Sequence, residues 1–200
     1  MTDRNDRRWN HNIHHHPRIL KAVPAGAQRA LDVGCGEGTL ARELRRTVPQ
    51  VTGIDLHAPS IEQGRAWADD VDHVLGDFLT HPFEPASFDV VASVATLHHM
   101  DAATGLTRMR DLLRPGGVLV VVGLARNTLP RDLPHVLAAI TVGAVHRAAK
   151  GHWQHPSPVV WPPPVTYPEM RALAAELLPG SRYRRHVLWR YSITWRKPRD

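Results

Sequence analysis

The chain has 200 residues, 42% of them hydrophobic and 22% charged, a balance typical of one globular domain spanning residues 1–200. Its apolar runs fall far short of the ~20 residues of a membrane helix, its charged N-terminus lacks the apolar core of a signal peptide, and its single cysteine excludes an internal disulfide framework, so we expect a cytoplasmic protein. The net charge of +6 and the pI near 10.2 are compatible with a nucleic-acid partner, but the scattered arginines favour an ordinary solvated surface.

Residues 31–41 are the most informative segment, because they read as a short apolar strand, a glycine-rich turn and the start of a helix. Gly34, Gly36 and Gly38 lack Cβ atoms, so a ligand can approach the backbone, and the amide groups at the helix N-terminus face the same space. A dinucleotide-binding fingerprint needs its third glycine three residues after the second, whereas Gly38 follows Gly36 by two. The turn therefore predicts a cofactor site that matches nicotinamide dehydrogenases poorly.

Strand-like and helical segments alternate after this turn. Residue patterns predict helices at 40–48, 60–67 and 102–113, strands at 51–55, 73–77, 88–94 and 118–122, and a turn at 114–117. This alternation predicts a parallel sheet whose ligand crevice lies at the carboxyl ends of the strands. Four residues of chemical interest occupy such ends, namely Gly34, Asp55, Asp77 and Ser93.

The later part of the chain differs in character. A helix is expected within the apolar stretch 127–151, whereas the proline-rich stretch 152–168 is incompatible with a regular helix or a central strand. A further helix is predicted at 169–178, and β-like residues at 182–196 predict two closing strands.

Five segments, taken in order, resemble the motif set of the class I S-adenosylmethionine-dependent methyltransferases: 31–41, 53–55, 76–77, 88–100 and 112–123. The run Leu-Leu-Arg-Pro-Gly-Gly-Val-Leu at 112–119 is particularly characteristic. The resemblance implies a doubly wound, mostly parallel, seven-stranded Rossmann-like α/β sheet with helices on both faces and a C-terminal antiparallel strand. It also implies S-adenosyl-L-methionine as cofactor and methyl transfer to an O, N or C nucleophile, in the small-molecule form of the family.

The strand ends supply the residues expected around the cofactor. Asp55 follows Gly34 by about 20 residues, the offset at which a nucleotide-binding unit places a carboxylate on ribose hydroxyls. By resemblance, Asp77 accepts from the adenine amino group and Asp32 contacts the methionine ammonium, directly or through water; Asp32 could instead accept from nearby loop amides. The remaining expected contacts are Gly34, Cys35 (as a small residue, not a nucleophile), Gly36 and Gly38 in the turn, Leu56 and Phe78 beside the adenine ring, and the backbone around Ser93 and Val94.

Two adjacent histidines follow the fourth predicted strand, where the resemblance places the substrate. An imidazole near neutral pKa can take a proton from an attacking hydroxyl or amine, so His98 and His99 are the candidate catalytic residues. The alternative is that one packs between loops and the other faces solvent. Segment 125–168 is the expected substrate cover, with Trp153, Trp161 and Tyr167 as candidate wall residues.

The tract 9–17 contains three successive histidines and belongs to an N-terminal segment, 1–20, which either folds over the cofactor or forms an unstructured leader. It lacks the cysteine or carboxylate spacing of a zinc site, so no metal is expected. Two other functions stay open. An RNA methyltransferase would use the arginines as a phosphate track, although the Asn/Asp-Pro-Pro-aromatic motif of many such enzymes is missing; a non-catalytic relative would bind the cofactor without turnover. The methyl acceptor and the oligomeric state cannot be read from these residues.

Overall fold

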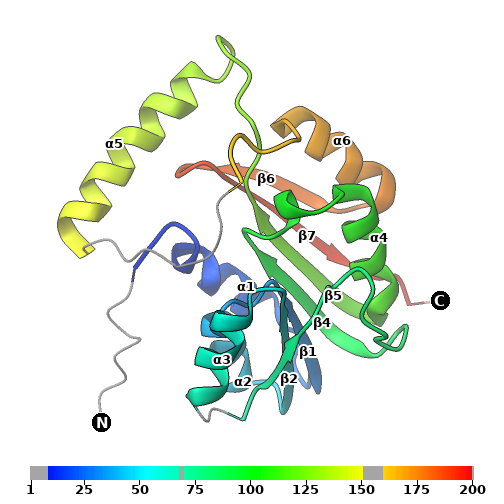
Figure 1. The fold of residues 1–200 in the computed structure, drawn as a ribbon. Coiled ribbons are helices and arrows are strands. Elements are labelled where there is room, and N and C mark those ends of the chain that lie inside the picture. Colours follow the sequence, from blue (N-terminus) through cyan, green and yellow to red (C-terminus); the bar gives the residue numbers. More distant parts are fainter. Residues whose placement is uncertain (1–8, 68–69, 151–159, 200) are drawn as a thin grey trace.

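The computed structural model describes residues 9–67, 70–150 and 160–199, and their strands form one seven-stranded sheet of order β3-β2-β1-β4-β5-β7-β6 (Figure 1). Strands β1 to β5 run parallel, and β7 pairs antiparallel with both β5 and β6. The predicted mostly parallel α/β sheet with a C-terminal antiparallel strand is therefore confirmed. The strands are β1 (Arg29–Val33), β2 (Gln50–Asp55), β3 (Asp72–Leu75), β4 (Phe88–Val94), β5 (Leu113–Gly123), β6 (Arg182–His186) and β7 (Arg190–Arg196).

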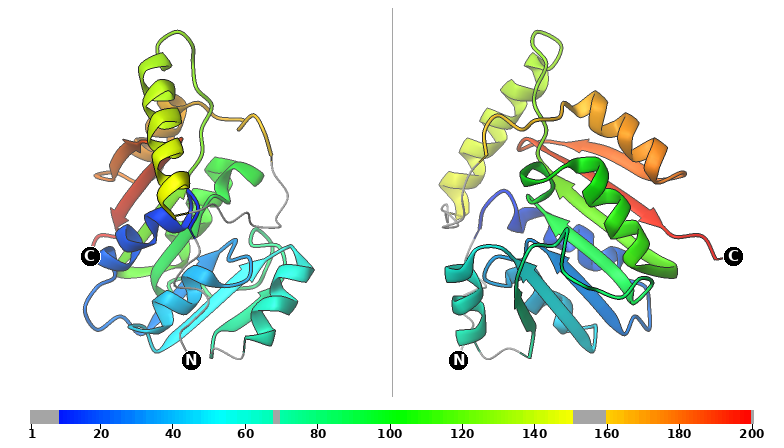
Figure 2. Two further views of the ribbon diagram at one scale, coloured as in Figure 1. Left: turned by 90° about the vertical axis from the view of Figure 1, so that its left-hand side faces the viewer. Right: turned by 45° about the vertical axis from the view of Figure 1, so that its right-hand side comes forward.

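Helices cover both faces of this sheet (Figure 2). On one face, Ile19 and Leu44 from the first two helices pack on the strands. On the other face, Leu106 and Met170 from α4 and α6 do so. The helices are α1 (His16–Ala22), α2 (Thr39–Arg45), α3 (Ala58–Ala66), α4 (Ala102–Leu112), α5 (Leu133–Lys150) and α6 (Tyr167–Leu177), with the short 3-10 turns η2 (Ile13–His15) and η3 (Leu97–His99).

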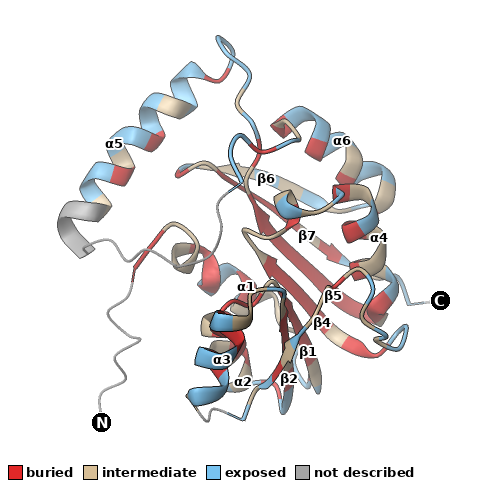
Figure 3. Cartoon of the chain, viewed as in Figure 1, coloured by how far each residue is buried: buried red, intermediate tan, exposed pale blue. Residues whose placement is uncertain are grey.

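The central strands are buried because their apolar runs leave no face for solvent, as Figure 3 shows. Residues 118–122 of β5 are at most 3% exposed, the pattern expected of a parallel strand covered on both sides. The carboxyl ends of β1, β2 and β4 meet at one edge, since register pairs Val33 with both Ile54 and Ser93. This edge is where the first loop, the β2 end and the β4 end converge.

Two predicted boundaries are wrong for physical reasons. Residues 114–117 do not form a turn before the strand; β5 already begins at Leu113, and the four residues make a bulge where its register with β4 shifts between Phe88 and Val90. Gly116 allows this with a φ of +79°. The last long helix starts at Tyr167, because Pro168 occupies its first turn and Thr166 and Glu169 form a capping box.

Helix α5 is set apart from the sheet (Figures 1 and 2). It falls within the apolar stretch predicted to be helical, yet four of its large apolar side chains are exposed: Leu133, Leu137, Ile140 and Val145. It contacts the N-terminal segment, where the Trp9 ring stacks on His146 with a centroid distance of 5.1 Å. Trp153 of the expected substrate cover lies outside the described residues.

Candidate active site

A cavity of about 760 Å³ opens at the carboxyl ends of the parallel strands. Its volume lies within the range of small-molecule sites. Residues from the loops after β1, β2, β3 and β4 line it, together with residues 10–13 and His16 of the N-terminal segment and Arg190 at the start of β7. The predicted site residues that line it are Asp32, Gly34, Cys35, Gly36, Asp55, Leu56, Asp77, Phe78, Val94, His98 and His99.

Two predicted residues, Gly38 and Ser93, do not line the cavity. Gly38 has a φ of +81° at the N-terminus of α2, and a Cβ there would overlap the His73 ring, so this glycine serves backbone geometry and packing. The Ser93 side chain is fully buried and donates to the carbonyl of Val33 at 3.0 Å, which links β4 to β1.

The glycine turn after β1 is shaped by close contacts. Gly34 has a φ of +73°, and a Cβ on it would overlap the Thr96 side chain of the β4 loop. The backbone N–H groups of Gly34 and Cys35 both donate to the carbonyl of Ile54, at 2.8 and 3.1 Å. The Cys35 thiol fills space left by Gly53, where a Cβ would come within 2.8 Å of the sulfur. The turn therefore has room for backbone and small side chains only.

Asp55 ties this turn to the end of β2. Its Oδ2 accepts from the backbone N–H of Gly36 and its Oδ1 from that of His57, each at 2.8 Å. A carboxylate has about four acceptor positions, so two remain for further donors. A pair of hydroxyls is a chemically suitable donor for them.

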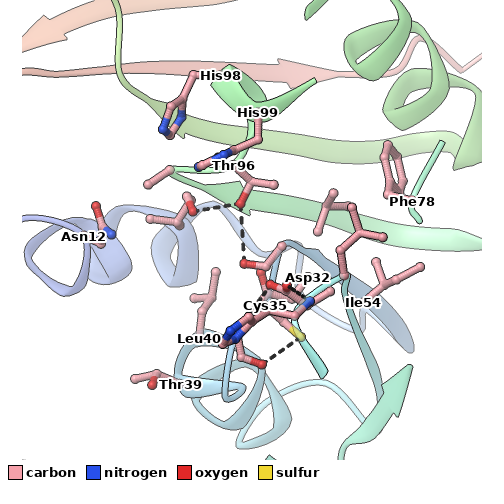
Figure 4. A pocket seen from close by; sticks show the side chains of 18 of the residues that line it. Asn12, Asp32, Cys35, Thr39, Leu40, Ile54, Phe78, Thr96, His98 and His99 are labelled. Carbon is pink, nitrogen blue, oxygen red and sulfur yellow. Dashed lines mark hydrogen bonds between the residues drawn. The ribbon is translucent and has the colours of Figure 1, made fainter. Parts of the chain in front are cut away.

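Asp32 is a buried carboxyl group with an unmatched oxygen. It is 2% exposed, and its Oδ2 has no hydrogen-bond partner in the described part of the chain. Burial, followed by the negative charge of Asp55, raises the pKa of Asp32 to about 7. A cation beside Oδ2 would satisfy the oxygen and offset the charge. Figure 4 shows Asp32 close to Cys35 in the cavity wall.

The part of the cavity beyond Asp55, at the ends of β2 and β3, is lined by both polar and apolar side chains. Asp77 accepts from the N–H of Leu79 through Oδ1 at 2.9 Å. Phe78 is buried beside it, with the Arg108 guanidinium 5.6 Å from the centre of its ring. Leu56 at the rim is 71% exposed, which is unusual for a leucine and leaves an apolar surface for a flat ring.

His98 and His99 project from η3 on the opposite side of the site, above Thr96 in Figure 4. Their ring centres lie 4.1 Å apart. Burial, with smaller effects of His99 and Arg190, lowers the pKa of His98 to about 4; burial also lowers the pKa of His99, against an opposing effect of Asp55. Both imidazoles are therefore neutral at pH 7, but the low pKa makes His98 a weak base, so His99 is the better placed of the two to accept a proton.

The loop that carries these histidines leaves β4 through a strained residue. Ala95 has a φ of +54°, uncommon for a residue with a side chain, and its N–H donates to the carbonyl of Val122 at 2.7 Å. Thr96 then donates to the Val94 carbonyl at 3.1 Å. This geometry directs the loop across the β1 turn.

The N-terminal segment contributes to the cavity wall. The Asn10 side chain accepts from the N–H groups of Asn12 and Ile13 at 2.9 and 2.8 Å, which fixes a tight turn. His16 Nδ1 lies 3.1 Å from Glu43 Oε1 and anchors α1 to α2. This tract stands out in the sequence for its histidines. The turn, however, depends on Asn10, and asparagine is a residue typical of turns.

Other expectations about the cavity wall are not met. Trp161 is 64% exposed and Tyr167 is buried, and neither lines the cavity. Among the described residues, none between 125 and 168 does so. Arg190 was missed, and no sequence signal separates it from the other arginines of the closing strands.

The described residues contain no group of three or more histidine, cysteine or carboxylate side chains able to hold a metal ion. No described helix is both long and apolar enough to cross a membrane.

Similarity to known proteins places this geometry in a family. An uncharacterized methyltransferase of Mycobacterium tuberculosis is 40% identical over 196 residues, covering 96% of this chain and 99% of the relative. The chain belongs to the class I methyltransferases. The family model described as a methyltransferase domain matches residues 31–121. The molecule is thus an S-adenosylmethionine-dependent enzyme by family, and the resemblance seen in its motifs is confirmed.

Other similarities concern parts of the methyltransferase or its fold. The ubiquinone biosynthesis O-methyltransferase of Xylella fastidiosa is 37% identical over 134 residues, which are 63% of this chain and 51% of that protein. A phosphoethanolamine N-methyltransferase of Haemonchus contortus, solved with phosphomonomethylethanolamine and S-adenosylhomocysteine, superposes with a TM-score of 0.66 at 16% identity, over 93% of this chain and 53% of that one. The second likeness is one of fold.

Proposed function

We propose that this methyltransferase binds S-adenosyl-L-methionine in the cavity and moves its methyl group to an oxygen of a small molecule. The observation that carries the proposal is the buried Asp32 Oδ2, which has no partner among the described residues and lies in the wall of a cavity bordered by the glycine turn. The methionine ammonium is a cation of suitable size for that oxygen. The likeness to an enzyme holding S-adenosylhomocysteine supports the cofactor, and the similarity to an O-methyltransferase supports an oxygen acceptor.

Residues from the ends of β1, β2 and β3 would bind the parts of the cofactor. Asp32 would hold the ammonium, the free lone pairs of Asp55 would hold the ribose hydroxyls, and Asp77 would accept from the adenine amino group. Leu56 and Phe78 would offer apolar surface to the adenine ring. When bound, the cofactor supplies a methyl group on a positively charged sulfur, which is already reactive.

The protein's own contribution is alignment, exclusion of water and proton removal. Holding two reactants in line can account for about 7–11 kcal/mol of a barrier. Residues 10–13 close one side of the cavity and limit access of water. Neutral His99, and less readily His98 with its pKa near 4, would take up the proton that the acceptor hydroxyl loses.

Calorimetry with S-adenosylhomocysteine tests the cofactor site. We expect the wild-type protein to bind it, and Asp55→Ala to bind at least tenfold more weakly, because charge-assisted hydrogen bonds to two hydroxyls are lost. Asp111→Ala, which removes an exposed acid distant from the cavity, is the matched control and should bind as wild type. Absence of binding, or equal binding by Asp55→Ala, would refute the proposed site.

The acceptor class is tested by transfer of a labelled methyl group into a fractionated cell extract. Label is expected in the small-molecule fraction and less of it with His98→Gln or His99→Gln. Label confined to RNA would support the alternative nucleic-acid substrate, and no label in any fraction would support a binding-only protein.

A further inference from the structure

Arg190 is a buried cation in the cavity wall, outside the half proposed for the cofactor. It is 7% exposed and begins β7, whose second residue, Tyr191, pairs with Gly123 at the end of β5. Because β7 runs antiparallel to β5, its start lies at the same edge of the sheet as the carboxyl ends of the parallel strands. The guanidinium therefore reaches the cavity from the β5–β7 side.

The hydrogen-bond partners of Arg190 are all neutral. Its Nη1 donates to the carbonyls of Leu188 and Trp189, each at 3.3 Å, and its Nε and Nη2 donate to Asn12 Oδ1 at 3.2 and 2.7 Å. No carboxylate pairs with it in the described part of the chain. By contrast, Arg185 of the neighbouring strand pairs with Asp132.

A buried guanidinium without a counter-charge is costly. Burial lowers the pKa of Arg190 to about 10, so the group remains charged at pH 7. The turn that presents it adds a further cost, since Leu188 and Trp189 both have positive φ angles, +67° and +55°. Such costs are commonly retained where they serve a ligand.

Charge is divided along the cavity. The acids in its lining, Asp32, Asp55 and Asp77, come from β1 and from the ends of β2 and β3. Arg190 comes from β7, which the sheet order places beyond β4 and β5. The two ends of the site thus favour opposite charges, a cation over β1–β3 and an anion over β5–β7.

We propose that the methyl acceptor carries an anionic group, a carboxylate or a phosphate, which Arg190 and Asn12 bind at the β5–β7 end of the cavity. The Asn12 oxygen already accepts from Arg190, and the amide NH2 of the same side chain has no partner among the described residues, so it can donate to the same anion. This inference rests on the proposed function for the idea that the occupant is the methyl acceptor; the anion site itself does not require it.

The test uses matched pairs of probes with the full chain, in the presence and absence of S-adenosylhomocysteine. Benzoate, hexanoate and phenyl phosphate are compared with benzamide, hexanamide and phenol by calorimetry. We expect at least one anion to bind tenfold or more tightly than its neutral partner, and the carboxylate and phosphate arms to show which group is preferred. Arg190→Met should remove that preference. Arg184→Met, which removes an exposed arginine from the adjacent strand, should keep it.

A second variant covers the case in which Arg190→Met fails to fold. Asn12→Asp places a carboxylate against the guanidinium as an internal counter-charge, so it should keep the fold, raise the melting temperature and abolish the preference for anions. Equal binding of charged and neutral probes by the wild type, or a preference that survives in Arg190→Met or in Asn12→Asp, would overturn the inference. Anion binding without any affinity for S-adenosylhomocysteine would refute the proposed function and leave the anion site intact.

Discussion

Asp32 combines a structural cost with a proposed binding role. Its carboxyl group sits inside β1, is fully buried and faces the negative charge of Asp55. Ionised, it destabilises the unliganded protein; paired with an ammonium, it contributes to ligand binding. The same side chain should therefore affect stability and affinity in opposite directions.

The substitution Asp32→Asn separates these two effects. At pH 8 we expect the unliganded variant to be more stable by about 1–3 kcal/mol, because a buried charge is removed, and this is measured by denaturant unfolding. Its affinity for S-adenosylhomocysteine should fall by tenfold or more, measured by calorimetry. A variant that loses stability and retains affinity would show that Asp32 serves only the loop amides.

Affinity for S-adenosylhomocysteine should also depend on pH near neutrality. Because the pKa of Asp32 is raised to about 7, its carboxyl group takes up a proton below that pH and loses its charge. The ligand ammonium pairs with the ionised form, so affinity should rise between pH 6 and pH 8. Asp32→Asn should bind with little dependence on pH over this range, and a wild-type affinity that is flat across it would contradict the assignment.

The N-terminal segment, η2 with α1, is an element held by imidazoles rather than by apolar side chains alone. His15 is 1% exposed, and its ring centre lies 5.2 Å from that of His186 on β6. Burial first, and then the neighbouring His186, His14, Arg18 and Arg190, lower the pKa of His15 to about 3. Burial, with the same kind of basic neighbours, lowers the pKa of His186 to about 4.

These shifts predict that acid weakens the attachment of the segment. Both histidines bind fewer protons in the folded chain than in the unfolded one, so their neutral form contributes stability above pH 6.5 that is lost as pH falls from there toward 4. We expect the melting temperature of the wild type to fall by several degrees between pH 7 and pH 5, with roughly 2–4 °C for each kcal/mol. The replacement His15→Phe should reduce this slope. An unchanged slope in the variant would mean that other groups carry the acid sensitivity.

At the scale of the whole molecule, the order of strands in the sheet places the acidic and the basic residues of the cavity at opposite ends of it. The strands that carry the acids lie on one side of β4, and the strand that carries Arg190 lies on the other. The N-terminal segment bridges them, because Asn12 contacts Arg190 from a distance of 178 residues along the chain. The overall net charge does not reveal this arrangement, because only a few charges line the cavity, and Asp32 and Arg190 among them are buried.

Local sequence was sufficient to predict a parallel sheet and most of the residues that line the cavity, and the family resemblance supplied the seven-stranded form. Apolar runs and the turn chemistry around Gly34 are short-range signals, and the carboxyl ends of parallel strands must share an edge, so Gly34, Asp55 and Asp77 could be expected together. The direction of side chains could not be predicted: the Ser93 hydroxyl donates to the Val33 carbonyl, Gly38 packs on His73, and Trp161 is exposed outside the cavity lining. The roles of Arg190 and Asn12 could not be predicted from the sequence for the same reason. Their pairing depends on the crossing of distant elements, and a buried arginine looks like any other in the sequence until its neighbours are in place.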